Sequence, residues 1–154
     1  MHRGELAFAL TSNQTVYEVL SWTVDIGGAW LEYLLALARH DRTAEARQAC
    51  DRLLEDPFRG LETRDAVARF LVTADGLNTE DRERGLQVAR DAYERSGRGG
   101  SARIEATLAE AELATGARAA AIARLRRIRD ALRRRSAEWI TVADVEQRLR
   151  ELER

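Results

Sequence analysis

Two stretches of this chain repeat one pattern in different residues. Each has an apolar segment with helical spacing, a short turn, and a second segment with a small residue near its start. The first stretch covers residues 30–53 and carries its small residue at Ala46; the second covers 104–128 and carries Ala121. A single helix pair cannot bury both of its faces, so such pairs must stack on neighbours. The repetition therefore predicts a helical array.

The apolar residues recur at helical spacing through most of the chain. Three predicted helix pairs span residues 28–57, 61–96 and 102–135, and a last helix spans 141–154. The expected helices run over 29–39, 43–55, 61–73, 82–96, 102–115 and 118–134. This pattern predicts one all-α domain, an α–α superhelix of about three antiparallel pairs closed by a C-terminal capping helix.

The predicted breaks lie at residues that cannot continue a helix. Residues 1–27 are expected to form a helical N-terminal segment, although its β-branched and aromatic residues also suit a strand. Gly27-Gly28 is expected to end that segment, and Pro57 ends the first pair. The glycine-rich loop 96–101 is interpreted as a linker, because it follows no strand and lacks the lysine of a phosphate-binding loop.

The composition excludes several kinds of chemistry. All 25 basic residues are arginine, so no lysine can form a Schiff base or contact a nucleotide phosphate. Cys50 is the single cysteine, and two separated histidines make no metal-ligand cluster. Cys50 lies on the apolar stripe of its helix, which favours a buried side chain over a nucleophile. We expect no catalytic residue, no metal and no cofactor.

The chain resembles the tetratricopeptide repeat family over about residues 28–135. Trp30, Ala46 and Pro57 match the opening, small and closing positions of the family pattern, whereas Leu34 departs from it. In the third pair, the matching positions are Leu108-Ala109, Gly116, Ala121-Ile122 and Leu125. The small sites Ala46, Gly85 and Ala121 are 39 and 36 residues apart, close to the family period of about 34.

The resemblance implies a function and a surface. First helices of such pairs line a concave groove that binds a protein or peptide segment. Carried over by position, the groove residues here are Leu35, Arg39, Asp65, Arg69, Arg103 and Glu110. Because three successive helices each present an arginine, the partner segment is expected to be acidic. The predicted function is therefore a non-catalytic interaction module or adaptor.

A second interpretation rests on the segment 118–135, which holds eight arginines against Asp130 alone. Such a charge run can bind nucleic acid, so a nucleic-acid-binding or regulatory module is the alternative function. No aromatic residue interleaves these arginines to stack on bases, which favours a solvated or protein-facing helix instead.

The last helix has a narrow apolar seam of Val142, Val145, Leu149 and Leu152. The seam suits a terminal helix that covers the open end of the array, and a homodimer through the same residues is the other possibility. Trp22, Trp30 and Trp139 are expected in core or cap packing. The apolar run 6–10 is too short for a signal segment, and no run approaches a membrane span, so a cytoplasmic protein is expected.

Overall fold

The computed structural model describes residues 26–57, 59–97, 101–133 and 142–153, and in these ranges the chain forms seven α-helices and no strand. The helices are α3 (Ile26–Arg39), α4 (Thr43–Glu55), α5 (Leu61–Thr73), α6 (Thr79–Ser96), α7 (Ala102–Ala114), α8 (Arg118–Leu132) and α9 (Val142–Leu152). The all-α prediction is confirmed for this part of the chain. The N-terminal helix expected within residues 1–25 lies outside it.

The start of α6 differs from the prediction. The helix begins at Thr79, three residues before the expected start at 82. Asn78 is its N-cap: the Asn78 side chain accepts from the Asp81 N–H, and the Asp81 carboxylate accepts from the Asn78 N–H. These reciprocal bonds satisfy donors that a helix start otherwise leaves unpaired. Residues 79–81 therefore form the first helical turn rather than part of a loop.

The prediction that Gly27-Gly28 ends a helix is wrong. The helix α3 already begins at Ile26, so both glycines lie in its first turn. Gly27 is buried against the start of α5, where an added Cβ would lie 2.8 Å from the backbone oxygen of Glu62. The missing side chain therefore allows two helices to approach closely.

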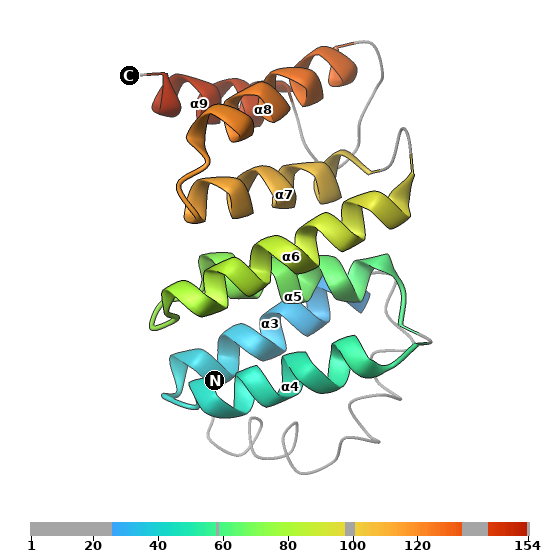
Figure 1. The fold of residues 1–154 in the computed structure, drawn as a ribbon, viewed down its shortest axis with the longest axis vertical. Coiled ribbons are helices and arrows are strands. Elements are labelled where there is room, and N and C mark those ends of the chain that lie inside the picture. The colour runs from blue at the N-terminus through green and yellow to red at the C-terminus, as the bar shows by residue number, and fades with distance from the viewer. Residues whose placement is uncertain (1–25, 58, 98–100, 134–141, 154) are drawn as a thin grey trace.

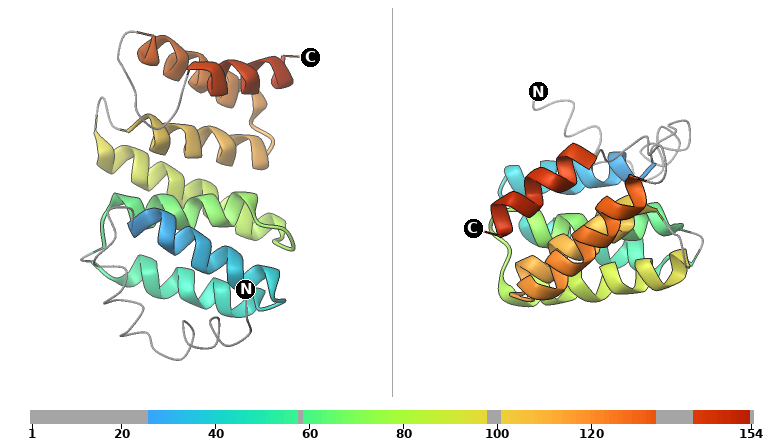
Figure 2. Two further views of the ribbon diagram at one scale, coloured as in Figure 1. Left: turned by 180° about the vertical axis from the view of Figure 1, so that it is seen from behind. Right: turned by 90° about the horizontal axis from the view of Figure 1, so that it is seen from above.

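The helices are stacked along the long axis of the molecule, and each packs against the next in sequence (Figure 1). In addition, α5 packs against both α3 and α7, which are not its neighbours in sequence. We call α3, α5 and α7 the odd-helix layer. At one end of the stack α9 lies alongside α8, and the view from behind shows the same order of helices (Figure 2).

The three small residues singled out in the sequence lie at the fourth, seventh and fourth positions of α4, α6 and α8, respectively. Ala46 in α4, Gly85 in α6 and Ala121 in α8 are all buried. A Cβ added to Gly85 would lie 2.7 Å from Val72 Cγ1 and 3.0 Å from Leu71 Cβ, so α6 is packed as closely on α5 as a glycine permits. At Gly85, a small residue that suggested a repeat in the sequence thus marks close packing of two helices.

The buried apolar residues form two separate clusters. The main core fills the space among α3, α4, α5 and α6 and reaches α7 through Leu108 and Ala111, with Phe70, Leu34 and Leu37 among its largest buried side chains. The second core consists of Ala109, Ala121, Leu125, Ile128, Leu132, Val145 and Leu149. The helix α7 therefore contributes to both cores, whereas α8 and α9 contribute only to the second.

Within the described part of the chain, no helix is both long enough and apolar enough to cross a membrane.

Candidate functional site

The predicted groove residues on α3 differ in exposure. Leu35 is half-buried and packs against the main core. Arg39 lies at the C-terminal end of the helix with 65% of its side chain exposed, and its nearest acidic group is Glu32, at 3.9 Å. An ion pair this exposed and this long contributes little to stability, so the Arg39 guanidinium can exchange it for another anion at low cost.

The predicted groove residues on α5 and α7 meet each other. Asp65 Oδ2 lies 3.2 Å from Arg103 Nε, with 3% of the Asp65 side chain exposed and 29% of Arg103. Burial raises the pKa of the Asp65 carboxyl, partly offset by the Thr107 hydroxyl and by the positive charges of Arg103 and Arg69. Arg69 follows Asp65 by one helical turn and is half-buried. This pair joins α5 to α7, and Asp65 is withdrawn from solvent beneath two arginines.

Glu110 on α7 is held from the other side. Arg148 of α9 donates to both of its carboxylate oxygens, from Nε to Oε1 at 3.0 Å and from Nη2 to Oε2 at 2.8 Å. The two-point geometry is the strong form of an arginine–carboxylate contact. Sequence reasoning missed Arg148, because 38 residues separate the partners and no local spacing links them.

The six predicted groove residues therefore have different structural roles. Asp65, Arg103 and Glu110 hold helices together, whereas Arg39 and Arg69 remain as cationic groups on α3 and α5 and Leu35 adds a partly exposed apolar group. All six do lie on the odd-helix layer. An accessible arginine on each of two adjacent helices can donate charge-assisted hydrogen bonds to a carboxylate of another chain.

The arginines of α8 are extensively paired with acids from other elements. Arg124 donates to both oxygens of Glu112, at 3.1 and 2.7 Å, and its guanidinium carbon lies 5.0 Å from the centroid of the Tyr93 ring. Further pairs are Arg127 with Glu105, Arg126 with Glu153 and Arg133 with Glu146. These acids lie outside the segment 118–135, so four of its arginines are paired with acids that the segment itself does not contain.

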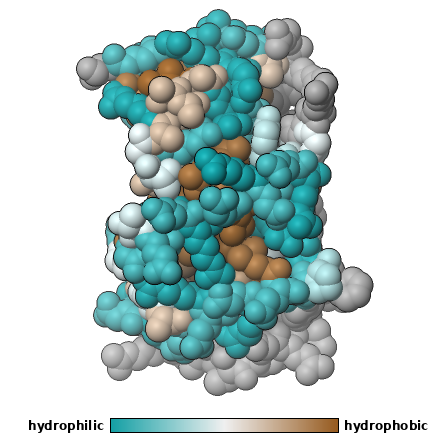
Figure 3. All heavy atoms as spheres, in the orientation of Figure 1, coloured by the Kyte–Doolittle hydropathy of each residue, from teal (hydrophilic) through white to brown (hydrophobic). Residues whose placement is uncertain are grey.

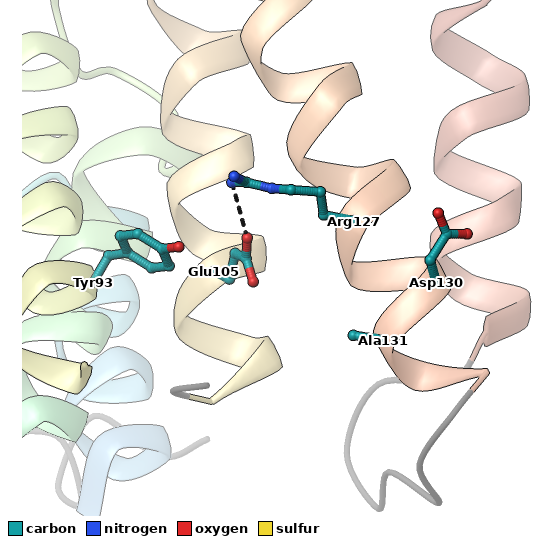
Figure 4. Close-up of a pocket in the computed structure, with 5 residues that line it drawn as sticks. All are labelled: Tyr93, Glu105, Arg127, Asp130 and Ala131. Carbon is teal, nitrogen blue, oxygen red and sulfur yellow. Dashed lines mark hydrogen bonds and ion pairs between the residues drawn. The ribbon is translucent and has the colours of Figure 1, made fainter. Parts of the chain in front are cut away.

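A cavity of about 380 Å³ opens between α6, α7 and α8 beside this network. Its lining residues are Tyr93, Glu105, Arg127, Asp130 and Ala131 (Figure 4). Arg127 Nη2 donates to Glu105 Oε1 at 3.1 Å, so the two charged groups nearest each other already neutralise one another. The described residues include no group of three His, Cys, Asp or Glu side chains that could hold a metal ion.

The even-numbered helices α4 and α6 are joined by ion pairs instead of direct packing. Arg47 Nη2 contacts Asp81 Oδ2 at 2.6 Å, and Arg84 pairs with Asp51 one turn further along both helices. The Arg47 guanidinium lowers the pKa of the Asp81 carboxyl below its ordinary value. Apolar surface is visible in the hollow between α4 and α6 (Figure 3).

Two further residues singled out in the sequence, Cys50 and Trp30, are buried in the main core. Cys50 is fully buried, as predicted, and burial raises the pKa of its thiol to about 12, so it is not a reactive thiolate at neutral pH. Trp30 is buried in the main core, with the Arg59 guanidinium 4.7 Å from its ring centroid. Trp22 and Trp139 lie outside the described residues.

The predicted dimer seam is largely covered within one chain. Val145 and Leu149 are buried against α8, and Leu152 is half-buried beside them. The side chain of Val142 is outside the described part. A dimer through this seam would first have to separate α9 from α8.

No protein-family model, curated protein or solved structure matches this chain.

Proposed function

We propose that this chain is a non-catalytic helical-repeat module that binds a segment of another protein across the odd-helix layer. The observation that carries the proposal is the packing of α5 on both α3 and α7, which places the first helices of three successive pairs side by side. Stacked helix pairs build extended surfaces of this kind, and such surfaces typically bind a partner chain.

The proposal includes a superhelical arrangement similar to tetratricopeptide repeats. Its support is internal: the small residues Ala46, Gly85 and Ala121 are buried near the start of α4, in the second turn of α6 and near the start of α8. A buried small residue in the second helix of each pair allows that helix to pack closely, and similar packing in successive pairs is the basis of a regular solenoid.

Within this surface, we assign direct contact with the partner to Leu35, Arg39 and Arg69. Asp65, Arg103 and Glu110 support the surface through their links between helices. The arginines of α8 carry no second proposal, because a nucleic-acid phosphate would have to displace Glu105, Glu112, Glu146 and Glu153 from them.

Site-specific crosslinking tests the surface directly. A photo-reactive amino acid is placed at Arg39 or Arg69 on the odd-helix layer, or at exposed Gln48 or Gln87 on α4 and α6. Each protein is incubated with extract of the source organism and irradiated. We expect one protein to be crosslinked from 39 and 69 and not from 48 or 87. Crosslinks mainly from 48 and 87, or to nucleic acid, would contradict the proposal.

A charge-matched pair of variants tests the arginines. Arg39→Gln/Arg69→Gln should abolish capture of the crosslinked protein, and glutamine avoids placing a second carboxylate near buried Asp65. The control, Arg52→Gln/Arg90→Gln, removes the same charge from exposed positions on α4 and α6 and should retain capture. Equal loss in both variants would mean that only overall charge matters.

A further inference from the structure

The attachment of α9 to the rest of the molecule is unlike that of the other helices. Among the described elements its backbone packs closely on α8 alone, whereas each of the others packs on at least two helices. Its buried residues, Val145 and Leu149, belong to the second core and make no part of the main core. Undocking α9 would therefore leave the packing of α3 to α6 intact.

Charged side chains fix how α9 lies on its neighbours. Arg148 of α9 binds Glu110 of α7 at 2.8 Å. Two further pairs have the acid on the C-terminal segment and the base on or next to α8. Glu146 binds Arg133, and Glu153 Oε1 lies 2.8 Å from Arg126 Nη2. A helix that fits this face must therefore carry an acidic, a basic and an acidic residue at the positions of Glu146, Arg148 and Glu153. It must also place two apolar residues, one helical turn apart, against α8.

These contacts are specific but individually weak. The six side chains of the three ion pairs are 31% to 55% exposed, and exposed pairs stabilise little on their own. An isolated helix of 11 residues is not stable in water, so α9 needs a surface to dock on. Its own chain offers that surface at high effective concentration, and a second copy offers an identical one.

We propose that the face made by α8 and Glu110 of α7 is a binding site for an amphipathic helix, and that its second occupant is α9 of another copy of this chain. Two chains then associate by exchanging their C-terminal helices. The charge pattern supplies the argument, since α9 of a second copy presents Glu146, Arg148 and Glu153 in the order that the face accepts. This inference does not depend on the odd-helix layer binding a partner.

Two complementary charge reversals test the exchange in the full-length chain. The face variant carries E110R, R126E and R133E; the helix variant carries E146R, R148E and E153R. In each chain alone, α9 meets like charges on its own face. When the two are mixed, each helix matches the face of the other chain, so exchange restores all three ion pairs twice.

Sedimentation velocity measures the outcome. We expect each variant alone to have the 17.3 kDa mass of one chain and the equimolar mixture to have twice that mass. A chain with all six substitutions has matched charges in cis again and should stay a monomer with either variant. A mixture that stays monomeric while both variants keep the helical circular dichroism of the wild type would overturn the proposal, as would equal association of the six-fold variant.

A second measurement does not require dimer formation. A fluorescent peptide of residues 142–153 is titrated into the helix variant. The face of this variant is native, but its own α9 carries charges that the face repels. We expect at least tenfold tighter binding than to the wild-type chain, where cis α9 competes, and no binding to the face variant. Equal affinity for all three chains would show that the face does not select this helix and would reject the proposal.

Discussion

The carboxyl groups of Asp65 and Asp81 have pKa values that are shifted in opposite directions. Asp65 is buried, and this burial raises its pKa although the Thr107 hydroxyl and the charges of Arg103 and Arg69 act in the opposite direction. Asp81 accepts from the Arg47 guanidinium and from the Asn78 backbone, and these bonds lower its pKa. The difference comes from desolvation in one case and from hydrogen bonds to the charged form in the other.

We therefore predict opposite effects of removing the two charges. A raised folded pKa means that ionised Asp65 costs stability as pH rises above its ordinary value of 3.8, so Asp65→Asn should raise the melting temperature at pH 7 and change it little at pH 3.5. A lowered folded pKa means that ionised Asp81 stabilises above pH 3.8, so Asp81→Asn should lower the melting temperature at pH 7. Thermal unfolding at both pH values checks the signs. Destabilisation by Asp65→Asn at pH 7 would show that its bond to Arg103 outweighs its burial.

Cys50 provides a chemical probe of the main core. Its thiol is buried and has a pKa of about 12, so the folded protein should react with iodoacetamide at pH 8 at least a hundredfold more slowly than the unfolded chain. Mass spectrometry of alkylated protein across a urea titration measures this. Rapid alkylation without denaturant would mean that α4 opens locally from the core.

At the scale of single helices, the sequence patterns located most elements and missed two details of their ends. Apolar spacing predicted α5 over its observed residues and α4 likewise. The capping box of Asn78 and Asp81 was a readable signal that starts α6 earlier than expected. Gly27 could not be interpreted in the same way, because a glycine that breaks a helix and one that permits close packing look identical in a sequence.

Gly85 tests the close packing of α6 on α5. Gly85→Ala should lower the free energy of unfolding by about 1–2 kcal/mol, since overpacking outweighs the gain in helix propensity. The new methyl group would meet Val72 Cγ1 at 2.7 Å. Val72→Ala removes that atom, so the double variant should be more stable than the sum of the two single changes predicts. Urea unfolding of all four proteins completes the cycle, and strict additivity would mean that the two positions do not interact.

At the scale of the whole molecule, two cores of unequal size divide the stability. The main core is built from α3 to α6 with part of α7, and the second core has seven buried residues, three of them alanine or valine. Fewer apolar residues are buried there, and the ion pairs that also hold α9 are exposed and individually weak. The C-terminal end should therefore open before the rest.

Hydrogen exchange as a function of salt tests this division. At low ionic strength, amides of α8 and α9 should exchange faster than those of α5 and α6. Raising sodium chloride to 1 M shortens the screening length to about 3 Å, so exchange in α9 should accelerate while α5 is unchanged. The variant Glu110→Gln/Arg148→Gln should show a smaller salt effect in α9. A uniform response along the chain would indicate one cooperative unit.

The amino-acid sequence by itself determined most of the described helices and the turns between them, and it singled out the buried small residues Ala46, Gly85 and Ala121, because apolar periodicity and local breaks act over a few residues. It also assigned Cys50 to the interior. Only the tertiary structure decided which charges meet. Arg103 with Asp65, Arg148 with Glu110 and Arg124 with Glu112 join different helices, 12 to 38 residues apart. Ion pairs depend on distance in space, so the sequence could not show that several arginines of the segment 118–135 pair with acids of other helices.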